Sequence, residues 1–154
     1  MVGVVQKQSR DQEADKLALA DFLIVNVVTG APDGHAKNVS MLRLADGAWI
    51  APLYDLATGL VYDGGAVDRT VALSIGGERQ ASRIRRRQWE RAAATLGLPV
   101  DRVLGRVVQL AGAYPDALTE ALDELGDADG AADVGERALS GARTHCTRLV
   151  DQLA

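Results

Sequence analysis

The chain has 154 residues, with 17 Lys and Arg against 21 Asp and Glu, so its formal net charge is −4. This length predicts one domain, and an apolar content of 47% supplies a packed core and excludes a wholly disordered chain. The mild acidity argues against a generic nucleic-acid binder, and the single cysteine excludes a disulfide framework within the chain.

Residues 1–14 are polar and show no sustained periodicity, so we expect an irregular leader without fixed structure. In residues 15–28 apolar side chains recur at helical spacing, which predicts a buried helix. Its longest apolar run, residues 22–28, is far shorter than the ~20 residues of a membrane span. The N-terminus also lacks the basic region and apolar block of a signal peptide. We therefore expect a cytoplasmic protein that does not contact a membrane.

The next elements are a hairpin and a helical half. Residues 39–44 and 48–53 predict two strands, because Asp46-Gly47 readily takes the backbone angles of a tight turn. Residues 57–80 predict a long irregular connection with one short strand at 71–75. Helices are then expected over 88–96, from residue 100, from Pro115 to residue 125 and, after an acidic loop at 126–131, over 134–153. The fold class is therefore mainly α.

The candidate catalytic residues lie on either side of the hairpin. Asp33 is followed five residues later by Asn38, and Asp55 comes just after the second strand. Protein-kinase-like phosphotransferases have the same order of Asp, Asn, hairpin and second Asp. Phosphoryl transfer needs a carboxylate that accepts the hydroxyl proton and oxygen ligands for Mg²⁺. His35 and Lys37 would add positive charge or hydrogen-bond donors near the transferred group.

Each of these residues also has a structural alternative. Pro-Asp-Gly is a turn signal that explains Asp33 without chemistry. Asn38 and Asp55 can serve as caps, and His35 can order the loop. The common register of Asp33, Asn38 and Asp55 favours the chemical interpretation. The six arginines between residues 79 and 91 are typical of a solvated helix face.

A family resemblance sharpens this interpretation. Residues 28–40, VTGAPDGHAKNVS, resemble the catalytic loop of the HipA toxin-like serine/threonine kinases, and residues 51–56, APLYDL, look like that family's metal-binding motif. Residues 72–78, Trp89 and residues 96–98 also look like its C-terminal half. The resemblance covers roughly residues 15–150. It implies a kinase-like C-lobe helical bundle with one small β-hairpin beside the catalytic loop.

The resemblance also implies roles for individual residues. Asp33 would be the catalytic base, and Asn38 and Asp55 would hold Mg²⁺. The ATP phosphates would be lined by His35, Ala36, Lys37 and Asn38, and by Tyr54, Asp55, Leu56 and Ala57. Members of this bacterial family phosphorylate a protein serine or threonine, in some cases on an aminoacyl-tRNA synthetase. A DNA-binding antitoxin typically restrains them. The mild acidity of the chain itself predicts that it does not bind nucleic acid directly.

The sequence departs from the family in one respect. Family members are considerably longer and carry a small lobe, with a phosphate-covering loop and a lysine, before the catalytic loop. No glycine-rich loop precedes Asp33 here. Residues 15–154 are therefore expected to form the large lobe alone, with an apolar hairpin side left exposed and a separate small-lobe protein as a candidate partner. Two alternatives stay open: a non-catalytic large lobe that binds a partner, and a small-molecule phosphotransferase.

Overall fold

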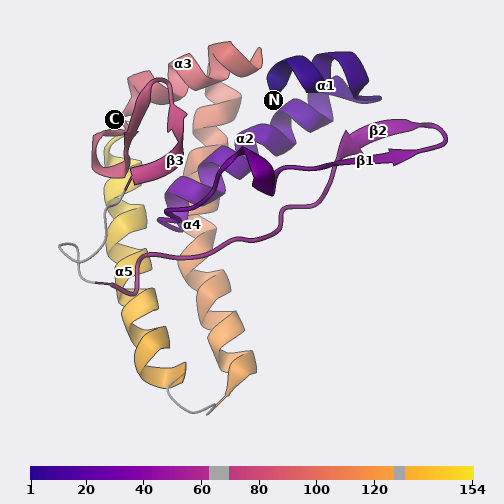
Figure 1. Cartoon of the computed structure of the whole chain (residues 1–154). Helices are drawn as coiled ribbons and strands as arrows, with labels where there is room; N and C mark the ends of the chain where they lie inside the picture. Colours follow the sequence, from indigo (N-terminus) through magenta and orange to yellow (C-terminus); the bar gives the residue numbers. More distant parts are fainter. Residues whose placement is uncertain (63–69, 127–130) are drawn as a thin grey trace.

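The computed structural model describes residues 1–62, 70–126 and 131–154. These ranges contain five α-helices and two two-stranded antiparallel hairpins (Figure 1). The helices are α1 (Val2–Gln8), α2 (Gln12–Val28), α3 (Arg86–Leu96), α4 (Val100–Leu125) and α5 (Ala131–Asp151). The strands are β1 (Met41–Leu44), β2 (Gly47–Ile50), β3 (Thr70–Ile75) and β4 (Glu78–Gln80). The predicted mainly α fold with a hairpin beside the loop is confirmed.

The core forms around α2, which contacts α3, α4 and α5. Its apolar stripe is buried together with Trp89 of α3, Val107 of α4 and Leu149 of α5. The side chain of Asp11 caps its N-terminus by accepting a hydrogen bond from Ala14 N at 3.0 Å. At the other end, His145 Nε2 lies 2.7 Å from the carbonyl oxygen of Val27, which ties α5 to the last turn of α2.

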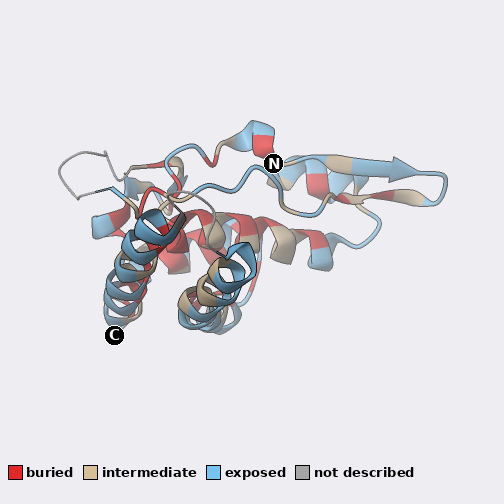
Figure 2. Ribbon diagram, turned by 90° about the horizontal axis from the view of Figure 1, so that it is seen from below, coloured by how far each residue is buried: buried red, intermediate tan, exposed pale blue. Residues whose placement is uncertain are grey.

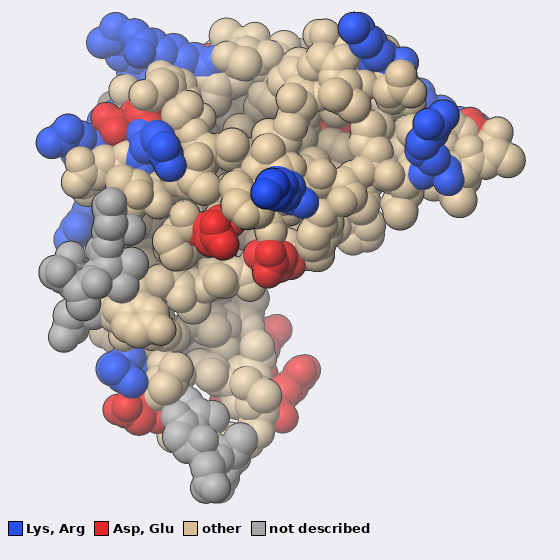
Figure 3. Space-filling model, in the orientation of Figure 1, with Lys and Arg blue, Asp and Glu red and all other residues tan. Residues whose placement is uncertain are grey.

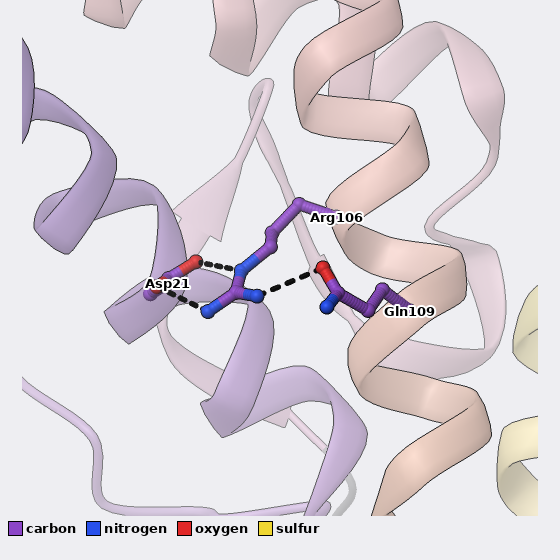
Figure 4. Close-up of polar contacts among 3 residues, drawn as sticks. All are labelled: Asp21, Arg106 and Gln109. Atoms are coloured by element: carbon purple, nitrogen blue, oxygen red, sulfur yellow. Dashed lines mark hydrogen bonds and ion pairs between the residues drawn. The ribbon is translucent and has the colours of Figure 1, made fainter.

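A bidentate ion pair joins α2 to α4 (Figure 4). Arg106 Nε and Nη2 donate to the two carboxylate oxygens of Asp21 at 2.7 and 2.8 Å. Nη1 of the same guanidinium donates to Gln109 Oε1 at 2.8 Å. The hydrogen bond to Asp21 raises the pKa of Arg106. The planar guanidinium thereby adds a directional link between the two helices, which also share the apolar core.

The N-terminal residues differ from expectation. Residues 2–8 form α1, and α2 starts at Gln12, although residues 1–14 were expected to be an irregular leader. Val5 of α1 is buried in the common core, and Gln12 Nε2 donates to the carbonyl oxygen of Gln6 at 3.0 Å. Too few apolar residues occur in this stretch to show a period, so contact with the rest of the chain determines its structure.

Pro115 was predicted to open a new helix, and that prediction is wrong because α4 continues through it. A proline within a helix removes one hydrogen bond and crowds the preceding turn. The helix nevertheless packs on α5 on both sides of Pro115: Ala111 shares the core with Cys146, and Leu122 lies against Gly135. Thr119 Oγ1 also donates to the Pro115 carbonyl at 2.9 Å. Tertiary packing therefore overrides the local signal.

The first hairpin matches its prediction with shorter strands, because β1 and β2 pair from Met41 opposite Ile50 to Leu44 opposite Gly47. It projects from the body of the molecule with most of its surface exposed (Figure 2). Leu42 and Leu44 are 45% and 63% exposed, so the expected apolar side is present. In the second hairpin the strand at 71–75 is confirmed as β3, whereas polar β4 was missed.

Parts of two predicted segments lie outside the described residues, namely 63–69 of the irregular connection and 127–130 of the acidic loop. Among the helices in the described ranges, none is long and apolar enough to cross a membrane.

Candidate active site

The segment that carries Asp33 is positioned by the C-terminal end of α2. Ala31 N donates to the carbonyl oxygen of Asn26 at 2.9 Å, which turns the chain back along the helix. Gly34 is buried against the Asn26 side chain, and a Cβ atom at residue 34 would lie 1.7 Å from Asn26 Oδ1. Only glycine therefore fits between Asp33 and His35 in this conformation.

Asn38 is the centre of the site and is 3% exposed. Its Oδ1 accepts a hydrogen bond from His35 N at 3.1 Å, and its Nδ2 donates to Asp55 Oδ2. Within the side-chain amide of Asn38 only the oxygen can accept a hydrogen bond from a backbone N–H, so the bond from His35 N indicates which way the amide points. The structure thus brings Asn38 and Asp55 together across 17 residues of sequence, as the motif order predicted.

Asp55 reaches Asn38 through an unusual backbone conformation. Its φ angle is +57°, the left-handed region that non-glycine residues rarely occupy and that is concentrated at functional sites. The preceding Tyr54 fixes this segment to the loop: its hydroxyl donates to the Lys37 carbonyl at 2.9 Å and lies 2.6 Å from Ser40 Oγ. Further along, the Leu60 side chain packs closely against Gly30 at the end of α2.

Asp33 is open to solvent. Its side chain is 84% exposed, and Oδ1 lies 3.8 Å from His35 Nε2. His35 is half-buried, and its Nδ1 is buried without a hydrogen-bond partner. The remaining predicted lining residues are all exposed: Ala36, Lys37, Tyr54, Leu56 and Ala57. Asp33 and these predicted lining residues are therefore accessible, whereas Asn38 is buried.

The residue types at the site suit a hard cation, whereas the amide of Asn38 presents its nitrogen to Asp55. Asp55 offers a carboxylate, and Asn38 Oδ1, which accepts from His35 N, keeps a second lone pair. Mg²⁺ takes such oxygen ligands and commonly completes its shell with water and substrate phosphates. The described part of the chain contains no cluster of three His, Cys, Asp or Glu side chains that could hold a metal.

Asn26 was missed by the sequence interpretation as part of this site. Its Nδ2 donates to the Phe22 carbonyl at 2.7 Å, and its Oδ1 is buried beside the loop without a partner. The sequence does contain a signal for this role, because Asn26 is the polar residue that interrupts the apolar run 22–28. A buried polar side chain in such a run indicates that something specific packs against it.

Comparison with known proteins places this arrangement in a family. Residues 1–118 match the family model described as the HipA-like C-terminal domain. The chain belongs to the HipA-like C-terminal domain family. The match begins at residue 1, so it includes α1 and the segment expected to be a leader.

Two curated relatives carry kinase names. The chain is 28% identical over 124 residues to Y4mE of Sinorhizobium fredii, covering 80% of this chain and 29% of that kinase-named protein. It is 26% identical over 113 residues to the serine/threonine-protein kinase toxin HipA of Shewanella oneidensis, covering 73% of this chain and 26% of the toxin. The chain thus spans less than a third of the length of either relative. The support for a kinase family therefore comes from the names of proteins that are much longer than this chain.

A solved structure shows the same fold. The Shewanella oneidensis HipA chain, in a toxin–antitoxin complex with HipB and operator DNA, superposes with a TM-score of 0.86 at 23% identity. The likeness covers 97% of this chain and 35% of that one. That complex contains an antitoxin and DNA, but at this identity the likeness shows the fold alone. The expectation that this chain does not bind nucleic acid directly is therefore not borne out by the comparison.

Proposed function

We propose that this domain is the catalytic large lobe of a HipA-like serine/threonine kinase, which transfers phosphate from ATP to a protein hydroxyl in the bacterial cytoplasm. The observation that carries the proposal is the contact between Asn38 and Asp55, with Asp33 on the same loop. Three residue types in kinase order, two of them in direct contact and the third on the same loop, favour phosphoryl transfer over the capping roles that each could have alone.

In this proposal Asp33 accepts the proton of the attacking hydroxyl, for which its exposed carboxylate is accessible to a protein substrate. Asn38 and Asp55 would hold Mg²⁺, which supplies charge neutralisation for the phosphates when bound. Exposed Lys37 and half-buried His35 would donate to phosphate oxygens. Tyr54, through its bonds to the Lys37 carbonyl and Ser40, keeps the Asp55 segment against the loop.

Residues outside this chain contribute to the proposed activity. Phosphoryl transfer depends on positioning and charge stabilisation from both sides of the nucleotide, and the kinase-named relatives are more than three times as long as the matched region. Exposed Leu42 and Leu44 provide an apolar surface suited to a further lobe or partner. We therefore expect the 154 residues alone to bind ATP weakly and to show little turnover, as measured by calorimetry and a radiolabel transfer assay.

The decisive experiment substitutes Asp33→Asn in the domain joined to or mixed with its small lobe. Loss of the general base should lower the transfer rate by about 10²–10⁴ while nucleotide affinity stays unchanged. Asp55→Asn should instead weaken Mg²⁺-dependent nucleotide binding. The control is Asp116→Asn, which removes an exposed carboxylate from α4. Full activity in Asp33→Asn would refute the assigned role, and transfer to sugars or antibiotics but not to protein would favour a small-molecule phosphotransferase.

An alternative function, a non-catalytic large lobe that binds a partner, is favoured by the same exposed leucines. It predicts that antitoxin or small-lobe binding is lost in Leu42→Ser together with Leu44→Ser, whereas Asp33→Asn leaves binding and every cellular effect of the protein unchanged. A growth assay with both variants separates the two functions, since a kinase toxin requires Asp33.

A further inference from the structure

A second polar site lies at the N-terminal end of α2, beside the strand β2. An open cavity of about 760 Å³ is present there, within the ~300–1,000 Å³ range of small-ligand sites. It is lined by Arg10, Asp11, Gln12, Ala14, Asp15, Ala18 and Trp49. None of these residues belongs to the candidate active site, which lies at the opposite end of α2.

One carboxylate oxygen of Asp15 has no hydrogen-bond donor. The residue is 4% exposed, and its Oδ1 accepts a hydrogen bond from Ile50 N of β2 at 2.8 Å. Its Oδ2 is buried and has no hydrogen-bond partner. A buried carboxylate oxygen without a donor carries its full desolvation cost. Asp15 therefore links α2 to β2 and keeps a second, buried oxygen without a donor.

The charges around the cavity favour a cation. Asp11, at the start of α2, contributes a second carboxylate. Arg10 also lines the cavity, but its guanidinium forms an ion pair with Asp46 in the hairpin turn. Asp15 lies in the first turn of α2, near the positive end of the helix dipole. The cavity thus contains more negative charge than its own arginine neutralises.

Trp49 gives the cavity an aromatic wall. Its side chain is half-buried and lines the same space as Asp15. Aromatic rings attract ammonium and guanidinium groups through the π face, by about 0.5–2 kcal/mol depending on exposure. A buried carboxylate next to an aromatic ring is a combination suited to organic cations and poorly suited to anions.

We propose that this cavity binds an alkylammonium or alkylguanidinium group, with the charged end directed to Asp15 and the alkyl part against Trp49. Such a group occurs both in free amines and in lysine or arginine side chains of peptides. The proposal is independent of phosphoryl transfer, since no residue is shared with the Asp33 loop.

The test is an NMR titration of the full chain with n-butylammonium chloride and n-butylguanidinium chloride. Binding should produce saturable shifts of the Trp49 indole N–H and of the Ile50 amide. Neutral 1-butanol and sodium chloride at equal ionic strength are the controls and should give no saturable shift. Absence of saturation with either cation, or the same response to sodium chloride, would overturn the proposal.

The matched variants are Asp15→Asn and Asp101→Asn. Both remove a first-turn aspartate, from α2 and α4 respectively. Asparagine at residue 15 can still accept from Ile50 N but directs an amide N–H₂ toward the ligand, so cation affinity should fall about tenfold or more. Asp101→Asn should bind as the original chain does. Trp49→Leu provides an independent variant at a half-buried position, and unchanged affinity in Asp15→Asn or in Trp49→Leu contradicts the proposal.

A capped Gly-Lys-Gly peptide distinguishes the two sources of the cation. Saturable binding of the peptide together with butylammonium would assign the cavity to a lysine side chain of a partner. Binding of butylammonium alone would assign it to a free amine. Either result supports the organic-cation site, and failure of the peptide, butylammonium and butylguanidinium together contradicts it whatever the kinase assays show.

Discussion

The helices and the candidate active site of this domain are held in place by different interactions. Helices α2 to α5 pack through a continuous apolar cluster that includes Trp89 and Val107. The loop from Ala31 to Asn38 and the segment around Asp55 have few buried apolar side chains and are joined by single hydrogen bonds and close backbone contacts. The comparison predicts that stability and site geometry can be altered separately, by substitutions in one region or the other.

The largest expected effect is on stability and comes from the core. Trp89 is 1% exposed and lies at the centre of the apolar cluster. Trp89→Ala should lower the free energy of unfolding by about 3–5 kcal/mol, measured by urea denaturation. Trp49→Phe, at a half-buried position, is the control and should cost much less. A loss similar to that of the control would contradict the assignment of Trp89 to the core.

The second prediction distinguishes the positioning of the candidate site from the packing of the core. Gly34→Ala would place a methyl group against the Asn26 side chain, which we expect to cost about 1–3 kcal/mol by overpacking. The amide resonances of His35 and Asn38 should shift, while those of α4 and α5 should not. Gly112→Ala, where nothing lies within 4 Å of an added Cβ, is the control and should be neutral or stabilising.

A double variant makes this prediction sharper. If the Asn26 side chain is the obstacle, Gly34→Ala combined with Asn26→Ala should restore the shifts of His35 and Asn38 toward their original values. Shifts that remain as large as in Gly34→Ala alone would show that the loop is positioned by another contact.

A smaller effect is expected for the ion pair between α2 and α4. Asp21→Asn removes a carboxylate that accepts two hydrogen bonds from Arg106. Because the pair is partly exposed and screened by solvent, the loss should be about 1 kcal/mol. A double-mutant cycle with Arg106→Gln measures the coupling, and 1 M salt should reduce it. Coupling near zero would mean that apolar packing alone sets the angle between these helices.

The smallest expected effect on stability near neutral pH comes from Cys146. Burial raises the pKa of its thiol from 9.0 to about 11. A raised folded-state pKa leaves stability unchanged below about pH 9 and lowers it as pH rises through about 11, because the unfolded chain releases the proton more readily. Cys146→Ser should flatten this part of a stability-against-pH curve. Thiol labelling of the folded chain at pH 8 should be slow, and rapid labelling would contradict burial.

The sequence predicts the helical region well because buried helix faces repeat at a fixed spacing. The stripes of α3, α4 and α5 are visible as patterns, and Gly97, with φ of +67°, ends α3 where expected. Pro115 misled the prediction because its local cost is outweighed by contacts between α4 and α5 that no local pattern contains. The segments α1 and β4 are too short to show a period, and β4 is also polar.

The candidate site was predictable in part. The spacing of Asp33, Asn38 and Asp55 predicted that they would act together, and the contact between Asn38 and Asp55 agrees with it. Their chemical roles stay predictions. The amide orientation of Asn38 was not predictable, since it depends on the hydrogen bond from His35 N. The close approach of Asn26 to Gly34 was not predictable either, because this contact between a helix and a loop depends on shape and not on residue type.

The contact between Gly34 and Asn26 has a consequence for how the loop responds to its surroundings. Steric contact with an uncharged amide does not change with ionic strength and does not titrate, unlike an ion pair. The position of the loop beside α2 should therefore be the same in dilute and concentrated buffer and across the pH range in which the helices stay folded. A change in activity with salt would then reflect the charge of the substrate or the nucleotide. The position of the segment beneath Asp33 would not change with salt.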